Sequence, residues 1–108
     1  MVKLKSETSD EQLVLFVQKG DKQAFDLLVL KYQGKMQSIV SRFIRDPDEV
    51  ADVVQEAFIK AYRALPKFRG DSKFYTWLYR IGVNTAKNYL VARSRRPPGS
   101  EIDLSDAE

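Results

Sequence analysis

The sequence predicts an all-α protein, a compact bundle of about four helices. Apolar residues recur at helical spacing along the chain, and no stretch alternates between apolar and polar residues as a strand would. Residues that stop or start helices, among them Gly20, Pro47 and Pro66, divide the chain into four such segments. A length of 108 residues suits one small domain with a modest core.

Caps and apolar stripes predict the first two helices. Ser9 and Gln12 form a capping-box pattern at the start of the first helix, which ends at Gly20. Asp21 is then placed to cap a second, longer helix. The residues expected to face the core are Leu13, Phe16 and Val17 in the first helix, and Phe25, Leu28, Val29, Tyr32, Met36, Ile39, Val40 and Phe43 in the second.

Asp46 and Pro47 mark the start of a third helix. Aspartate is a favoured N-cap, and proline is tolerated in the first turn because its missing N–H has no partner there. The helix is expected to run to about Leu65, because Pro66 restricts the residue before it and cannot continue the helix.

A loop over residues 66–71 precedes the fourth helix. Ser72 or Asp71 is expected to cap this helix, which continues towards Arg93 and is closed by the Pro-Pro-Gly run at 97–99. The expected organisation is therefore an N-terminal extension over 1–9, a helical domain over 10–96, and a disordered acidic linker or tail over 97–108.

Composition excludes several classes of function. The sequence has no cysteine, so disulfides, thiolate nucleophiles and thiolate metal sites are impossible, and it has no histidine, the commonest general base. No other convergent catalytic cluster stands out, so neither an enzyme nor a cofactor is expected. No apolar run approaches the roughly 20 residues that span a bilayer, and the first residues lack a secretory signal. A cytoplasmic protein is the economical interpretation.

Charge is distributed unevenly along the chain. Residues 46–59 carry five carboxylates and no cation, whereas residues 60–96 carry ten cations and one carboxylate. The C-terminal residues are acidic again. Two segments of opposite charge suggest two different partners, although two solvated helix faces would produce the same pattern.

The acidic segment is amphipathic on a helical wheel. Val50, Val53, Val54, Ala57 and Phe58 gather on one side, and Asp48, Asp52, Gln55 and Glu56 on the other. Carboxylates four residues apart repel one another, so this arrangement brings no benefit to folding. The polar side is interpreted as a docking face for a basic partner helix, with a merely solvated face as the alternative. A metal site is disfavoured, because a linear array of acids forms no closed cage.

The fourth helix combines aromatic rings with a polar stripe. Phe74, Trp77, Leu78 and Ile81 have the spacing of a buried face, with Trp77 at its edge and one ring face accessible. Arg80, Asn84, Lys87 and Asn88 form a second stripe. Asparagine is a mediocre helix former, but its amide both donates to and accepts from a base edge. This stripe therefore favours contact with nucleic-acid bases.

The loop before this helix carries one exposed-looking ring, Phe68, among cations. Lys60, Arg63, Lys67, Arg69 and Lys73 surround the loop and are candidates for backbone phosphates. The Phe68 ring either packs on the third helix or receives an extruded base. Aromatic side chains stack most readily on bases that are unstacked, so single-stranded nucleic acid is favoured over duplex. A helical protein–protein adaptor is the main rival, and a duplex-reading helix-turn-helix is another.

These blocks, in this order and spacing, resemble the second region of a bacterial RNA polymerase sigma factor. The residues that carry the resemblance are Asp48-x-x-x-Asp52-x-x-Gln55-Glu56-x-Phe58, the run FRGDS at 68–72, the run TWLYRI at 76–81 and Asn84-x-x-Lys87-Asn88. More narrowly, the chain is similar to the extracytoplasmic-function class, close to the envelope-stress factors of proteobacteria. The similarity extends from about Asp10 to Pro98.

The resemblance implies a role for each charged surface. Asp48, Asp52, Gln55 and Glu56 would dock on the clamp coiled coil of the largest subunit of core RNA polymerase. The loop and the fourth helix would melt the −10 element and capture a flipped base of the non-template strand. The pocket would be lined by Lys60, Ala64, Phe68, Asp71 and Ser72, with Trp77 beside them. Asn84 and Asn88 would read neighbouring bases, while Arg80, Lys87 and Arg93 would hold phosphates.

The resemblance also implies a further domain and a further partner. Sigma factors of this class carry a second helical domain that reads the −35 element, and here the chain ends at Glu108. We therefore expect a fragment that lacks the region-4 domain. Family members are often held by a membrane-tethered anti-sigma protein that competes for these surfaces, so an anti-sigma factor is an expected partner.

Overall fold

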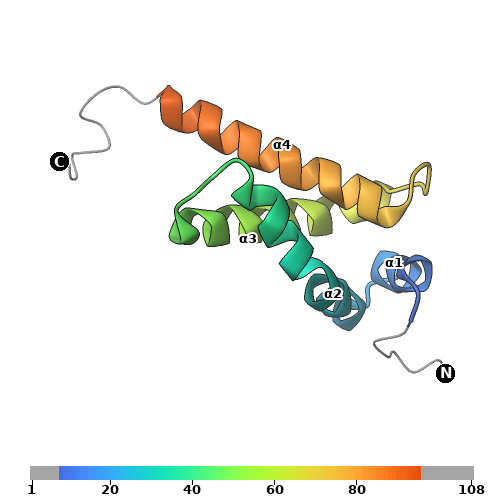
Figure 1. Ribbon diagram of the computed structural model, residues 1–108. Coiled ribbons are helices and arrows are strands. Elements are labelled where there is room, and N and C mark those ends of the chain that lie inside the picture. Colours follow the sequence, from blue (N-terminus) through green and yellow to red (C-terminus); the bar gives the residue numbers. More distant parts are fainter. Residues whose placement is uncertain (1–7, 96–108) are drawn as a thin grey trace.

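A computed structural model describes residues 8–95 of the chain, and it is all-helical over that range, as predicted (Figure 1). The elements are α1 (Asp10–Gln18), α2 (Lys22–Ser41), α3 (Pro47–Ala64), the 3-10 turn η1 (Leu65–Lys67) and α4 (Phe74–Ser94). The predicted acidic tail and most of the predicted N-terminal extension lie outside the described residues.

Local caps start and stop the first two helices where the sequence predicts. The Ser9 hydroxyl accepts the Gln12 backbone N–H, and the Gln12 side chain accepts the Ser9 N–H, which completes the capping box. After α1, Gly20 adopts a φ of 103°, in the left-handed region that favours glycine. The N–H groups of Gly20 and Asp21 donate to the carbonyls of Val17 and Phe16 in a Schellman motif. The Asp21 carboxylate then caps α2.

The start of α3 follows the prediction, whereas the start of α4 does not. The Asp46 side chain accepts the Asp48 N–H at 3.2 Å, with Pro47 in the first turn. The predicted caps of α4, Ser72 and Asp71, are wrong, because the N-cap is Lys73 and it makes no side-chain cap bond. The Ser72 hydroxyl instead donates to the Lys73 carbonyl. The 3-10 turn η1 continues the chain beyond α3 and shifts the loop to residues 68–73.

The helices form one bundle in which α4 lies along α3 and α2 contacts both (Figure 1). Helix α1 packs against α2 and also contacts η1, so it reaches the chain segment that leads into the 68–73 loop. The fold therefore places α1, the loop and the start of α4 at one end of the bundle.

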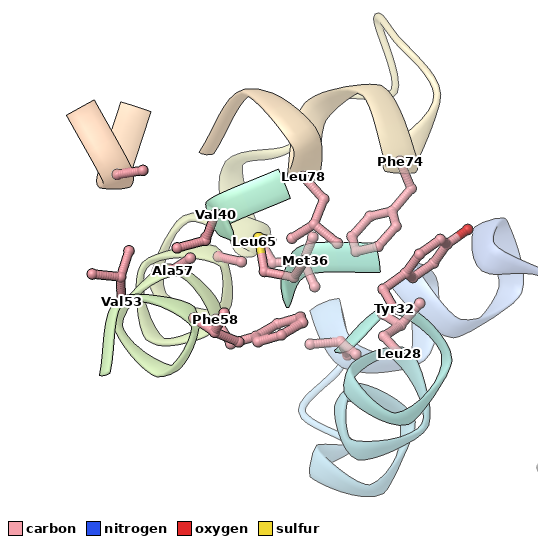
Figure 2. Close-up of a cluster of buried hydrophobic side chains, with 14 of the residues drawn as sticks. Leu28, Tyr32, Met36, Val40, Val53, Ala57, Phe58, Leu65, Phe74 and Leu78 are labelled. Carbon is pink, nitrogen blue, oxygen red and sulfur yellow. The ribbon is translucent and has the colours of Figure 1, made fainter. Parts of the chain in front are cut away.

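The core fills the space between α2, α3 and α4 (Figure 2). Its members include Leu28, Tyr32, Met36 and Val40 from α2, Val53, Ala57 and Phe58 from α3, and Phe74 and Leu78 from α4. The predicted stripes are confirmed, although Phe16, Phe25, Val29, Phe43, Trp77 and Ile81 are only partly buried. Sequence patterns missed Ile44 and Leu65, which are both fully buried and lie just outside the α-helices.

Gly82 of α4 is buried and packs directly against α2. A methyl group at Gly82 would lie 2.5 Å from Sδ of the buried Met36. Below Gly82, Thr85 and Ala86 continue the buried face of α4, and the Thr85 hydroxyl donates to the Ile81 carbonyl at 2.6 Å. The buried stripe of α4 therefore continues through small residues that a search for large apolar side chains overlooks.

A polar link joins α1 to α2. The Tyr32 hydroxyl donates to Asp10 Oδ2, and Lys31 Nζ lies 2.6 Å from Asp10 Oδ1. The Tyr32 ring also stacks on Tyr75 of α4, with ring centroids 5.4 Å apart. Burial, and then the hydrogen bond to Asp10, raises the pKa of the Tyr32 phenol well above its usual range.

Tyr32→Phe is expected to cost about 1 kcal/mol of unfolding free energy at neutral pH, because it removes one hydrogen bond and keeps the ring. The raised pKa gives a further signature. An unfolded tyrosine titrates near pH 10, so the contribution of the phenol is complete below about pH 10 and is lost as the pH rises towards the folded pKa. Urea unfolding of the wild type and of Tyr32→Phe between pH 8 and pH 11 measures this loss of unfolding free energy. Equal alkaline loss of stability in the wild type and Tyr32→Phe would contradict the account.

Candidate functional site

The predicted acidic face of α3 is present. Asp48, Asp52, Gln55 and Glu56 are all exposed, and the opposite side of the helix is buried in the core. The helical spacing of these four residues directs their side chains away from the buried stripe of α3. The face is thus available to a partner, whereas Glu49 beside it is half-buried and engaged elsewhere.

Two ion pairs connect the acidic helix with basic residues. Glu56 Oε2 and Lys60 Nζ lie 3.3 Å apart, one helical turn from each other on the exposed side of α3. Glu49 Oε1 accepts a hydrogen bond of 2.7 Å from Arg93 near the end of α4. The Arg93 guanidinium also lies 5.8 Å from the centre of the Tyr89 ring. Arg93, predicted to hold a phosphate, is therefore already paired with a carboxylate. Of the other candidates for phosphate contacts, Lys60 alone takes part in the ion pairs described over residues 8–95.

The polar stripe of α4 is exposed along its length. Arg80, Asn84, Lys87 and Asn88 are all exposed and recur at helical spacing, so they share one face. From Arg80 to Asn88 this face extends about 12 Å along the helix axis. The stripe presents two amides and two cations to the solvent, the combination that base edges and phosphates require.

Rings at the start of α4 hold the loop residue Phe68. The Phe68 ring centroid lies 5.0 Å from that of Trp77 and 6.4 Å from that of Phe74, in tilted and edge-on arrangements. Phe74 is buried, while Phe68 and Trp77 are half-buried. The aromatic partners of Phe68 thus come from α4, not from the third helix named as the alternative. Part of this cluster remains accessible to a stacking partner.

An open groove of about 530 Å³ lies beside the loop. One wall is the loop, with Phe68, Arg69 and Ser72, and Lys73 and Phe74 lie at its end. The other wall is α1, through Glu11, Val14, Leu15 and Gln18. Sequence patterns gave α1 no part in the site, because its residues show only the ordinary spacing of a core helix. The groove exists because the tertiary fold brings α1 to the loop.

The predicted base pocket is brought together only in part. Phe68 and Ser72 line the groove, together with the predicted phosphate ligands Arg69 and Lys73. Lys60 and Ala64 lie one turn apart on the last turns of α3, and neither lines this groove. Asp71 is exposed in the loop, and Lys67 is exposed in η1. Arg63 lines a different hollow, between α2 and α3.

That second hollow is an apolar groove of about 850 Å³. Phe25 and Val29 of α2 and Val54, Phe58, Ile59 and Tyr62 of α3 line it, and Phe25 and Tyr62 meet edge to face at 4.9 Å. Gln55 of the acidic face also lines this groove, so the two surfaces adjoin. Ile59 and Tyr62 are exposed. An apolar groove beside acidic side chains suits an amphipathic, basic helix.

Over residues 8–95 there is no group of three or more acidic side chains arranged to hold a metal ion. None of the helices described there is long and apolar enough to cross a membrane.

Comparison with known proteins defines the class of this domain. Residues 28–96 match the family model described as Sigma-70 region 2, and the chain belongs to this family. The family inferred from the sequence is thereby confirmed. Sigma factors are transcription initiation factors and not enzymes, in agreement with the expectation from composition.

The curated relatives are RNA polymerase sigma factors. The chain is 65% identical over 103 residues to the RNA polymerase sigma-H factor of Pseudomonas aeruginosa, covering 95% of this chain and 53% of the relative. It is 64% identical over 105 residues to the ECF RNA polymerase sigma-E factor of Escherichia coli, covering 97% of this chain and 54% of the relative. The chain thus spans about half the length of the curated relatives it matches.

Two solved structures share the fold. An engineered region 2 of sigma-E, determined by NMR in complex with GTAAAA, is 59% identical and superposes with a TM-score of 0.80 over 88% of this chain and 99% of that one. CnrH, solved in complex with the cytosolic domain of CnrY, is 28% identical with a TM-score of 0.68 over 90% of this chain and 73% of that one.

Proposed function

We propose that residues 10–96 are the promoter-recognition domain of a sigma factor, which reads the −10 element as single-stranded DNA and captures a flipped base. The observation that carries this function is the exposed stripe of Asn84 and Asn88 on α4, placed on the same helix that holds the Phe68 loop. The complex of a related, engineered sigma-E region 2 with GTAAAA supports the choice of ligand.

Different parts of this surface would do different work. Phe68, with Trp77 behind it, offers a ring for an unstacked base, and Ser72 in the adjacent groove offers a hydroxyl. Asn84 and Asn88 would read the edges of neighbouring bases. Arg69, Lys73, Arg80 and Lys87 would neutralise phosphates, since all four are exposed and none has a carboxylate partner among the described ion pairs. Lys60, Ala64 and Asp71 are proposed as further members of the base pocket, although they do not line this groove.

The acidic face would dock on core RNA polymerase. Asp48, Asp52, Gln55 and Glu56 are exposed together on α3. The polar stripe of α4 is exposed as well, so both surfaces are open to partners. Opposite charge favours a basic partner surface, and the family resemblance points to the clamp coiled coil of the largest subunit. The naming of the relatives as RNA polymerase sigma factors supports this partner.

An anti-sigma factor is proposed as the regulatory partner. CnrH, which shares this fold, has been solved bound to the cytosolic domain of another protein, CnrY. We also propose that the protein acts in the bacterial cytoplasm, because promoter DNA and RNA polymerase are found there.

Strand binding tests the proposed function. A labelled hexamer GTAAAA and single-base variants of it are titrated with the 108-residue chain at several salt concentrations. We expect tighter binding of the best strand than of its duplex, and affinity that falls as salt rises. Asn84→Ala is expected to lose about 1–3 kcal/mol of discrimination between strands. Lys87→Ala is expected to weaken all strands alike and to reduce the salt slope by about 0.7.

The control is Gln23→Ala, because Gln23 is exposed at the start of α2 and lines neither groove. It is expected to leave both affinity and discrimination unchanged. Equal binding of scrambled strands by the wild type would refute base-specific capture, and absence of binding at low salt would refute strand binding altogether.

A further inference from the structure

One side chain of α1 is hydrogen-bonded to the segment that enters the loop. Nε2 of Gln18 donates to the carbonyl of Leu65 at 3.0 Å and to the carbonyl of Phe68 at 2.9 Å. These partners are 47 and 50 residues further along the chain. Both N–H groups of the amide are therefore used, one on the carbonyl of the first residue of the 3-10 turn and one on the carbonyl just after the turn.

This contact matters most for Phe68. Leu65 is fully buried and is held by the core whether or not Gln18 is present. Phe68 is half-buried, and its own N–H donates back to the Leu65 carbonyl within the same turn. Over residues 8–95, the remaining hydrogen bonds described for the loop are local: the Ser72 hydroxyl and the Trp77 N–H both donate to the Lys73 carbonyl. Gln18 thus provides the hydrogen bonds that fix the loop to another helix.

The amide itself is held on a rigid support. Gln18 is the last residue of α1 and lies within the Schellman motif that Gly20 and Asp21 close onto Val17 and Phe16. Val17 beside it is buried in the core. The backbone that carries Gln18 is therefore held in place. A donor held in this way restricts the position of the carbonyl that it binds.

We propose that Gln18 is a positioning residue for base capture, which holds the Phe68 backbone so that the ring stays against Trp77 and its free side meets the flipped base. This inference rests on the proposed function. Gln18 contacts the backbone of Phe68. Its effect on DNA binding is therefore indirect and depends on the position of Phe68. The loop would otherwise have to be ordered when the strand binds, and that ordering would subtract from affinity.

Two substitutions separate the hydrogen bonds from the shape of the side chain. Gln18→Met keeps the length and removes both donors. Gln18→Glu keeps the shape but places acceptor oxygens against two carbonyls, so it is expected to be the more harmful. Because Gln18 is only partly buried, both variants are expected to fold, which circular dichroism and thermal unfolding verify. Gln23→Met, at an exposed site on α2, is the matched control.

The first measurement needs no DNA. Trp77 is the single tryptophan of the chain, and its ring touches the Phe68 ring. If Gln18 holds Phe68 in place, Gln18→Met and Gln18→Glu will shift Trp77 emission to the red and increase its quenching by acrylamide, while Gln23→Met will not. Folded Gln18 variants with wild-type emission and quenching would overturn the inference.

The second measurement uses the hexamer GTAAAA with an abasic site placed at each position in turn. In the wild type, the abasic position that costs most affinity marks the captured base. Gln18→Met is expected to bind the intact strand about tenfold more weakly, the equivalent of two modest hydrogen bonds. It is expected to bind the strand abasic at that position as the wild type does. Equal weakening of both strands would assign Gln18 a merely structural role.

The outcomes distinguish this inference from the proposed function. A wild type that binds intact, abasic and scrambled strands equally refutes base capture itself. A wild type that discriminates, together with Gln18 variants that discriminate equally well, refutes only the role of Gln18.

Discussion

Asp52→Arg is expected to abolish association with core RNA polymerase while the domain remains folded. Asp52 is exposed in the middle of the acidic face, one helical turn from both Asp48 and Glu56. Reversal of its charge places a cation where a basic coiled coil would dock, so attraction becomes repulsion across the whole face. The change also relieves two repulsive carboxylate pairs at i,i+4, each a few tenths of a kcal/mol, so stability should not fall.

Co-purification or a fluorescence binding assay with core polymerase measures this effect, and thermal unfolding establishes that the variant is folded. The control is Glu11→Arg, which makes the same charge change at an exposed site on α1. Glu11→Arg is expected to retain polymerase binding. Wild-type association of Asp52→Arg would refute the docking role of α3, and equal loss in both variants would show that total charge matters, not this face.

Leu78→Ala is expected to lower the free energy of unfolding by about 2–5 kcal/mol. Leu78 is 1% exposed and projects from α4 into the core beside Met36 and Phe74 (Figure 2). Truncation removes apolar contact and leaves a cavity that close-packed neighbours fill only in part. Domains of this size are commonly stable by only about 5–15 kcal/mol, so the loss is a large fraction of the total.

Leu30→Ala provides the matched control, because Leu30 lies on α2 and is 64% exposed. The same chemical change there is expected to alter stability by less than about 0.5 kcal/mol. Urea unfolding followed by circular dichroism compares the two. Similar losses at both positions would contradict the described position of α4 in the core.

The helices and their faces were predictable because the signals for them are local. The capping box at Ser9, the N-cap Asp46 and the stop at Gly20 depend on residues within one turn, and all three are present. The core and acidic sides of α3 follow from a period of 3.6 residues alone. The family was recognisable for a related reason, since its blocks have fixed spacing along the chain.

The start of α4 shows where local reasoning fails. Ser72 and Asp71 are both good caps by type, yet the helix begins one residue later, after Lys73 and without a side-chain cap. The Phe68–Phe74–Trp77 ring cluster holds this end of the helix instead. Packing over several elements outweighed a capping preference of about 1 kcal/mol.

By itself, therefore, the sequence determined the all-α class, the register of each helix and the family, because each depends on neighbours a few residues apart. Only the tertiary structure decided that Gln18 meets the carbonyl of Phe68, that Glu49 pairs with Arg93, and that α1 forms a wall of the loop groove. Gln18 and Phe68 are 50 residues apart, and nothing in the residue types predicts their meeting. Such contacts arise from how whole helices pack, and that is set by the shape of the entire core.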